Sequence, residues 1–144
     1  MPRSSRACLT GTMVATQYFA AMSMDGFIAG PGNAMDWLVQ LESSEGWDGR
    51  FRSFFSCIGA MAMGATTYEW ALGHVYGPEP EKWQQHYGQI PCWVFTHRRL
   101  RAVREANLVF ARGDLRMAHK QMLAAADDKN LWLVGGGDLV RAVR

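Results

Sequence analysis

Asn130-Leu-Trp-Leu-Val-Gly-Gly-Gly-Asp-Leu-Val140 is the stretch that decides the fold. Its short apolar run, Leu131 to Val134, is typical of a fully buried strand. A glycine triplet follows at once, and the pattern after Asp138 is helical. Bare backbone between a strand and a helix N-terminus lets free N–H groups approach an anion closely. The stretch therefore indicates a phosphate site, with an ordinary strand–helix turn as the alternative.

The composition is that of one globular domain. The chain has 144 residues, of which 49% are hydrophobic and 19% charged, and this is enough for a single sizeable core. The net charge of +2 is too small to favour a nucleic-acid partner. No apolar run reaches membrane-spanning length. Residues 1–12 are polar and basic, so we expect a flexible leader before a domain at residues 13–144.

Cysteine and histidine usage argues against disulfides and metals. The three cysteines, Cys8, Cys57 and Cys92, are far apart and odd in number, which favours reduced thiols and a cytoplasmic location. The four histidines are isolated and show no ligand spacing. The sequence therefore predicts a cytoplasmic protein without a metal site.

Strand patterns alternate with helix patterns along the chain. We expect strands at residues 14–24, 59–63, 92–95, 108–111 and 131–134, the first of them central in the sheet. Asp114 is typical of a helix N-cap. Such alternation predicts an α/β fold with a mainly parallel sheet covered by helices on both faces. Ligands of these sheets bind beyond the carboxyl ends of the strands.

Three of the expected strand ends carry residues that suit phosphate. They are Gly64 to Thr67, Thr96 to Arg98, and Gly135 to Gly137. The dinucleotide pattern G-x-G-x-x-G fails, because its third glycine position is Val140, and no Walker lysine is present. These absences weigh against a Rossmann domain and a P-loop enzyme.

Several stretches in order resemble the dihydrofolate-reductase-like fold. Ala20 to Ala29 resembles its first strand with a Ser-x-Asp-Gly break, and Asn33 to Trp37 resembles the end of a mobile loop. Met63-Gly-Ala-Thr-Thr-Tyr-Glu69 is similar to a Met-Gly-Arg-x-Thr-Tyr-Glu pattern. Within this fold the chain resembles the reductases that are similar to the C-terminal domain of the riboflavin-biosynthesis deaminase–reductase, over about residues 14–144.

The resemblance implies an NADPH-dependent reductase. Carried over position by position, it implies cofactor contacts at the nicotinamide, at the adenosine 2′-phosphate and at the pyrophosphate. The residues concerned are Ala21, Ile28, Gly64, Ala65, Thr66, Thr67, Thr96, His97, Arg98, Gly135, Gly136, Gly137, Asp138 and Leu139. Two of them depart from the pattern, because Ala65 replaces an arginine and Asp138 adds a negative charge near the pyrophosphate.

The substrate and catalytic residues are less defined. The basic residues that the riboflavin-pathway reductases carry near Phe19 and Phe27 are absent. We expect hydride transfer to a small carbonyl or imine, pterin- or pyrimidine-like, in a pocket lined by Met35, Asp36, Trp37 and Phe55; Phe54 and Phe55 also read as plain core. A nucleotide-binding module without activity, or an inactive truncated fragment, is the alternative function.

The last helical pattern is short. It begins at Asp138 and reaches only Arg144, with no C-cap glycine. In the fold that the chain resembles, further strands follow and pair beside the first strand. We therefore expect either that the C-terminal strands are lacking, or that a homodimer partner covers the exposed edge of residues 14–24.

Overall fold

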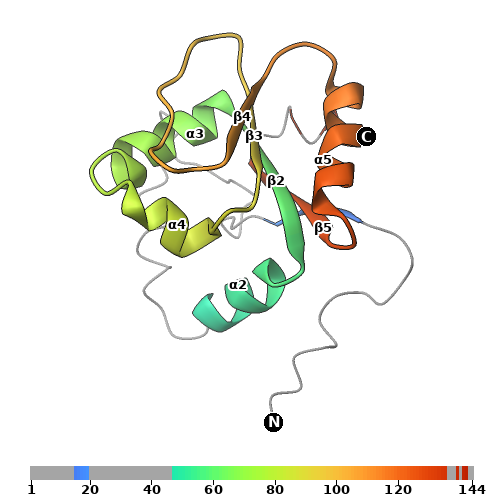
Figure 1. Ribbon diagram of the computed structural model, residues 1–144, viewed down its shortest axis with the longest axis horizontal. Helices are drawn as coiled ribbons and strands as arrows, with labels where there is room; N and C mark the ends of the chain where they lie inside the picture. The colour runs from blue at the N-terminus through green and yellow to red at the C-terminus, as the bar shows by residue number, and fades with distance from the viewer. Residues whose placement is uncertain (1–14, 20–46, 136–138, 140, 143–144) are drawn as a thin grey trace, which may run out of the picture.

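The structure is a computed structural model that describes residues 15–19, 47–135, 139 and 141–142 (Figure 1). Five strands form one sheet in the order β1-β5-β2-β3-β4, and every strand pair is parallel. The strands are β1 Thr16–Tyr18, β2 Ile58–Gly64, β3 Cys92–Phe95, β4 Leu108–Ala111 and β5 Asn130–Gly135. The expected parallel α/β sheet is confirmed.

Helices cover both faces of the sheet (Figure 1). They are α2 Trp47–Phe55, α3 Ala65–Ala71 with its π-helical extension η2 Leu72–Tyr76, α4 Glu81–Tyr87 and α5 Leu115–Ala126. Asp114 caps α5 as expected, because its carboxylate accepts a hydrogen bond from the Arg116 N–H at 2.8 Å.

Alternation along the strands divides the core into two clusters. On β2, Met61 and Met63 belong to the cluster beneath α2, α3, η2 and α4, whereas Ala60 and Ala62 belong to the cluster beneath α5. The first cluster is rich in aromatic rings, among them Tyr68, Tyr76, Trp83 and Trp132. The second is mainly aliphatic, with Trp93 as its buried ring, and on the helix Ala118, Met122 and Ala126 are buried.

The edges of the described sheet are β1 and β4. Sequence reasoning placed the first strand centrally, and this is wrong for the described residues, because β1 pairs there with β5 alone. Tyr18 on β1 is exposed, as are Val109 and Phe110 on β4. Residues 20–24 lie outside the described part, so the expected length of this strand stays a prediction.

The cysteines depart from the sequence expectation. Cys92 is free and buried, and burial raises the pKa of its thiol above the ordinary value. Cys57, however, takes part in a disulfide bond. The argument for reduced thiols therefore fails at this position.

Candidate functional site

The ends of three neighbouring strands meet at one edge of the sheet. Gly64 at the end of β2 is in register with Phe95 of β3, and Met63 is in register with Gly135 of β5. Because all three strands are parallel, the residues after each strand emerge on the same side. The structure therefore brings the Gly64–Thr67 and Thr96–Arg98 segments and the first glycine of the triplet to one edge.

Gly135 packs directly against the start of α3. A Cβ atom built there would lie 2.9 Å from Thr67 Oγ1 and 3.4 Å from Thr67 Cγ2. A Cβ on Gly64 would have the Gly135 carbonyl oxygen at 4.0 Å as its nearest neighbour. Bare backbone at Gly135 is thus required for close packing between β5 and α3, which is one reason for the first glycine of the triplet.

The chain passes from β2 into α3 without a capping side chain. Gly64 is the N-cap, with an extended backbone at φ −80° and ψ 167°, and no side chain accepts from the first-turn N–H groups there. Thr66 in this turn is exposed, and Thr67 is partly buried beside Gly135. Ala65 can offer an incoming anion only its backbone N–H.

Thr96 shapes the turn that follows β3. Its side chain is buried, and its hydroxyl oxygen accepts from the Arg98 N–H at 3.0 Å and donates to the Arg98 carbonyl at 3.1 Å. The hydroxyl is therefore used within the turn. The expectation that Thr96 lies at the adenosine ribose stays a prediction, and the neighbouring His97 and Arg98 are exposed.

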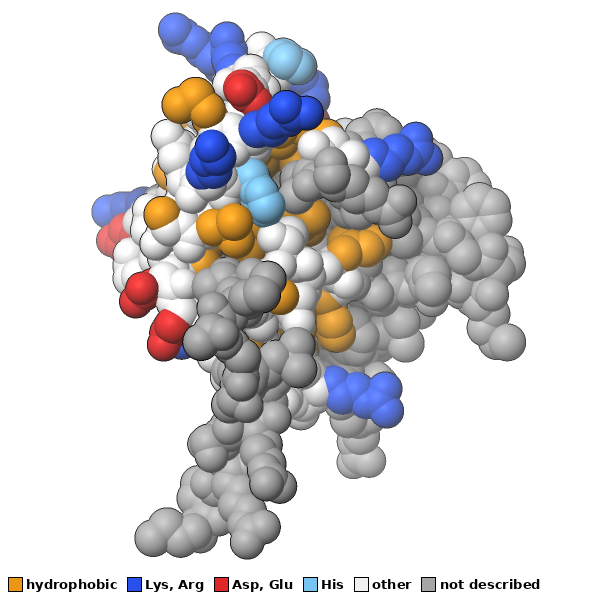
Figure 2. Space-filling model, turned by 90° about the vertical axis from the view of Figure 1, so that its right-hand side faces the viewer, with side chains coloured by type: hydrophobic (Ala, Val, Ile, Leu, Met, Phe, Trp, Pro, Cys, Tyr) orange, Lys and Arg blue, Asp and Glu red, His pale blue; other side chains and the backbone are white. Residues whose placement is uncertain are grey.

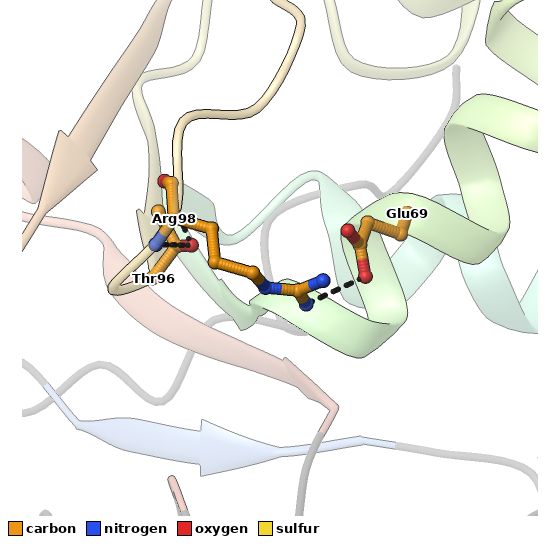
Figure 3. A network of polar contacts seen from close by, with 3 residues as sticks. All are labelled: Glu69, Thr96 and Arg98. Atoms are coloured by element: carbon orange, nitrogen blue, oxygen red, sulfur yellow. Dashed lines mark hydrogen bonds and ion pairs between the residues drawn. The ribbon is translucent and has the colours of Figure 1, made fainter.

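The turn directs Arg98 back across α3. Its Nη2 donates to Glu69 Oε2 at 2.8 Å, so that the guanidinium bridges the segment after β3 and the helix after β2 (Figure 3). The two side chains are 62% and 39% exposed. Sequence reasoning singled out Arg98 but missed Glu69, although it stands in the Thr-Tyr-Glu part of the quoted motif.

Tyr68 on α3 holds the loop that follows β3 through two hydrogen bonds. Its hydroxyl donates to the Arg101 carbonyl at 2.6 Å and accepts from the Val103 N–H at 3.2 Å. Burial raises the pKa of Tyr68 to about 12, against a smaller lowering by the Val103 hydrogen bond, so the phenol stays neutral at physiological pH. It ties the loop after β3 to α3 and is a second residue that sequence reasoning did not select.

Positively charged side chains gather at one end of the molecule. Viewed from the α5 side, Lys and Arg side chains gather at the upper end of the molecule, near the loops that follow β3 and β4 (Figure 2). Such a grouping raises the local concentration of anions. It matches the chemistry of a phosphate-bearing ligand.

Comparison with known proteins establishes the fold. No family model matches the chain. A solved structure from Shewanella sp. PV-4, provisionally assigned to riboflavin biosynthesis, matches with a TM-score of 0.64 at 21% identity, over 88% of this chain and 67% of that one. The two proteins share one fold. The dihydrofolate-reductase-like resemblance is confirmed at this level.

A curated relative is also found in Bacillus subtilis. The uncharacterised protein YwjB is 30% identical over 125 residues, which cover 87% of this chain and 66% of YwjB. The chain thus spans about two thirds of the length of each of these two proteins.

The fold accounts for two of the remaining candidates as core residues. Leu139 is 7% exposed in the cluster beneath α5, so only its backbone remains for a cofactor. Phe55 is partly buried, with its ring 5.6 Å from Phe51 and 6.3 Å from Trp132. Phe54 stacks on Phe19 at 4.3 Å. Eight candidates lie outside the described residues: Ala21, Ile28, Met35, Asp36, Trp37, Gly136, Gly137 and Asp138.

The part of the chain that the structure describes has two further properties. Within it, no group of three or more His, Cys, Asp or Glu side chains could hold a metal ion. None of the described helices is long and apolar enough to cross a membrane.

Proposed function

We propose that this chain is an NADPH-dependent oxidoreductase that transfers hydride to a small carbonyl or imine, of pterin- or pyrimidine-like shape. The observation that carries the proposal is the meeting of three segments at one sheet edge. Gly64–Thr67, Thr96–Arg98 and Gly135 come from separate parts of the sequence and are adjacent through strand register and the Glu69–Arg98 ion pair. The shared fold supports it.

The described residues fit an anionic dinucleotide. Bare backbone at Gly64 leaves room for a phosphate, since a Cβ there would meet no atom closer than 4.0 Å, and the uncapped first turn of α3 presents N–H groups. Thr66 offers an exposed hydroxyl. Arg98 offers an exposed guanidinium, whose planar fork suits a phosphate in two-point contact.

NADPH, when bound, supplies the hydride. The residues of the chain have the tasks of binding, orientation and exclusion of water. In this proposal the N–H groups and hydroxyls at Gly64–Thr67 hold phosphate oxygens, while Arg98 neutralises the 2′-phosphate on the adenosine ribose. Thr96 holds the Arg98 backbone in place through its two hydrogen bonds.

Cofactor selectivity tests the assignment of Arg98. Arg98→Ala should weaken NADPH by about tenfold to a hundredfold and leave NADH nearly unchanged, because a hydrogen bond to a charged group is worth about 1.5–3 kcal/mol. Arg99→Ala is the matched control, since Arg99 is the exposed neighbouring arginine. Calorimetric titration of both cofactors measures the result, and equal losses for NADPH and NADH would remove Arg98 from the 2′-phosphate.

The same preparation separates an enzyme from a binding module. A reductase oxidises NADPH when a pterin-, pyrimidine- or simple carbonyl-bearing acceptor is added, which is followed as loss of nicotinamide absorbance. A nucleotide-binding module without activity binds NADPH and shows no such loss with any acceptor. We further propose a cytoplasmic homodimer, and light scattering tests the dimer.

A further inference from the structure

The ion pair between Arg98 and Glu69 joins segments that lie 29 residues apart in the sequence. Glu69 lies on α3 three and four residues after Thr66 and Ala65, and residues at these spacings share one side of a helix. The Arg98 guanidinium is therefore drawn toward the side of α3 that begins at the proposed phosphate-binding turn (Figure 3). The small Ala65 side chain leaves that side of the first turn uncrowded.

Both ends of the arginine are held by contacts within the protein. The backbone at Arg98 is held by the Thr96 hydroxyl at 3.0 and 3.1 Å, and the tip is held by Glu69 at 2.8 Å. The side chain nevertheless stays 62% exposed. A guanidinium has five N–H donors, and the contact with Glu69 uses the Nη2 group. Donors therefore remain for a second anion.

We propose that Glu69 is a positioning residue, which holds the Arg98 guanidinium in the orientation that receives the 2′-phosphate of NADPH. The inference rests on the proposed function. Long side chains lose rotamer freedom when they bind, and pre-ordering removes part of that loss before the cofactor arrives. Glu69 thus contributes to selectivity for NADPH without touching the cofactor.

A carboxylate close to a phosphate also repels it, and this opposes the positioning effect. The ion pair is exposed, so that water and salt weaken the repulsion, with a screening length of about 8 Å at physiological ionic strength. In this proposal the positive guanidinium attracts both the carboxylate and the phosphate, which offsets part of their mutual repulsion. We therefore expect positioning to prevail, and the sign of the Glu69→Gln effect decides between the two.

The test compares Glu69→Gln with Glu79→Gln. Glu79 is a matched control, because it also forms an exposed ion pair, with Lys82 at 2.7 Å, and loses the same charge on substitution. Glu69→Gln should weaken NADPH by about twofold to fivefold, as expected for an exposed ion pair. NADH affinity should be unchanged, and Glu79→Gln should alter neither. Calorimetry with NADPH, NADH and 2′,5′-ADP measures the three affinities.

The outcomes separate this inference from the function on which it rests. If the unsubstituted protein binds neither dinucleotide, the proposed function fails and Glu69 loses its role with it. If NADPH preference depends on Arg98 but Glu69→Gln leaves it unchanged or increases it, only the positioning role is overturned. In an Arg98→Ala background, Glu69→Gln should cause no further loss of preference, and an independent loss there would contradict the inference.

Discussion

The face of the sheet beneath α2, α3, η2 and α4 is filled with aromatic rings, whereas the face beneath α5 is mainly aliphatic, with Trp93 as its buried ring. On the first face Trp132 meets Phe51, Phe54 and Phe55 edge-on, at centroid distances of 5.4–6.3 Å. On the second, a Cβ atom at Gly59 would lie 2.3 Å from the Ala126 carbonyl oxygen. One face derives its stability from ring volume, and the other from the close approach of a helix.

Opposite kinds of substitution should therefore destabilise the protein at the two faces. Where rings fill the space between helices and sheet, removing atoms leaves a cavity. Where backbone already touches backbone, adding atoms forces the helix outward. On the aromatic face, a substitution that removes side-chain atoms should destabilise the protein more than one that adds them. On the face beneath α5, a substitution that adds atoms should destabilise it more than one that removes them.

Truncation of Trp132 is the strongest test. Trp132→Ala should lower the free energy of unfolding by about 3–5 kcal/mol, the usual cost of removing a large buried aromatic side chain. Urea denaturation followed by circular dichroism measures it. A loss below about 1 kcal/mol would mean that the surrounding rings collapse into the space, and that ring volume does not stabilise this face.

Two smaller changes separate ring volume from hydrogen bonding. Trp132 Nε1 donates to the Phe19 carbonyl at 3.0 Å, whereas Trp83 Nε1 is buried without a hydrogen-bond partner in the described part of the chain. Trp132→Phe and Trp83→Phe remove the same atoms. Trp132→Phe should lower the free energy of unfolding by about 1 kcal/mol more than Trp83→Phe, because only Trp132→Phe breaks a hydrogen bond. Equal losses would show that volume alone matters.

Much of this two-sided architecture could be predicted from local sequence. The runs Cys92–Phe95 and Leu108–Ala111 were expected with the bounds that the structure shows, because short apolar segments between polar ones have few alternatives. Asp114 marked the start of α5 equally well. The hydrophobic period of a segment and the residue that caps a helix are local properties, so they can be read from a single sequence.

The contacts that local sequence could not give depend on distant partners. Nothing local distinguishes a pocket-lining Phe55 from one that packs on Phe51 and Trp132. The Thr96 hydroxyl suited a ribose, but the turn uses it internally. Glu69 could not be selected from local sequence, because its partner Arg98 comes within 2.8 Å of it only in the folded protein.

The α5 face is tested by adding one methyl group. Gly59→Ala should lower the free energy of unfolding by about 1–3 kcal/mol, because the backbone of Ala126 cannot yield as a flexible side chain would. Gly73→Ala is the control, since Gly73 lies within η2 and a Cβ there meets nothing within 4 Å. That change should be neutral or stabilising by up to about 1 kcal/mol. Equal destabilisation by both would contradict close packing at α5.

Substitution of Tyr68 should have a small effect on the free energy of unfolding. The dependence of this effect on pH should show that it arises from the Tyr68 hydroxyl. Tyr68→Phe removes the hydroxyl bonded to Arg101 and Val103, and at pH 8 this should cost about 0.5–1.5 kcal/mol. Burial raises the pKa of Tyr68 from 10.0 to about 12, so the folded state holds its proton more tightly than the unfolded state. The contribution of Tyr68 is therefore complete below pH 10 and is lost as the pH rises through about 12. Urea denaturation at pH 8 and pH 11 should show the gap between wild type and Tyr68→Phe narrowing at the higher pH. A gap that stays constant or widens would mean that the phenol ionises as easily in the folded protein as in the unfolded chain, and that the aromatic face admits water beside α3.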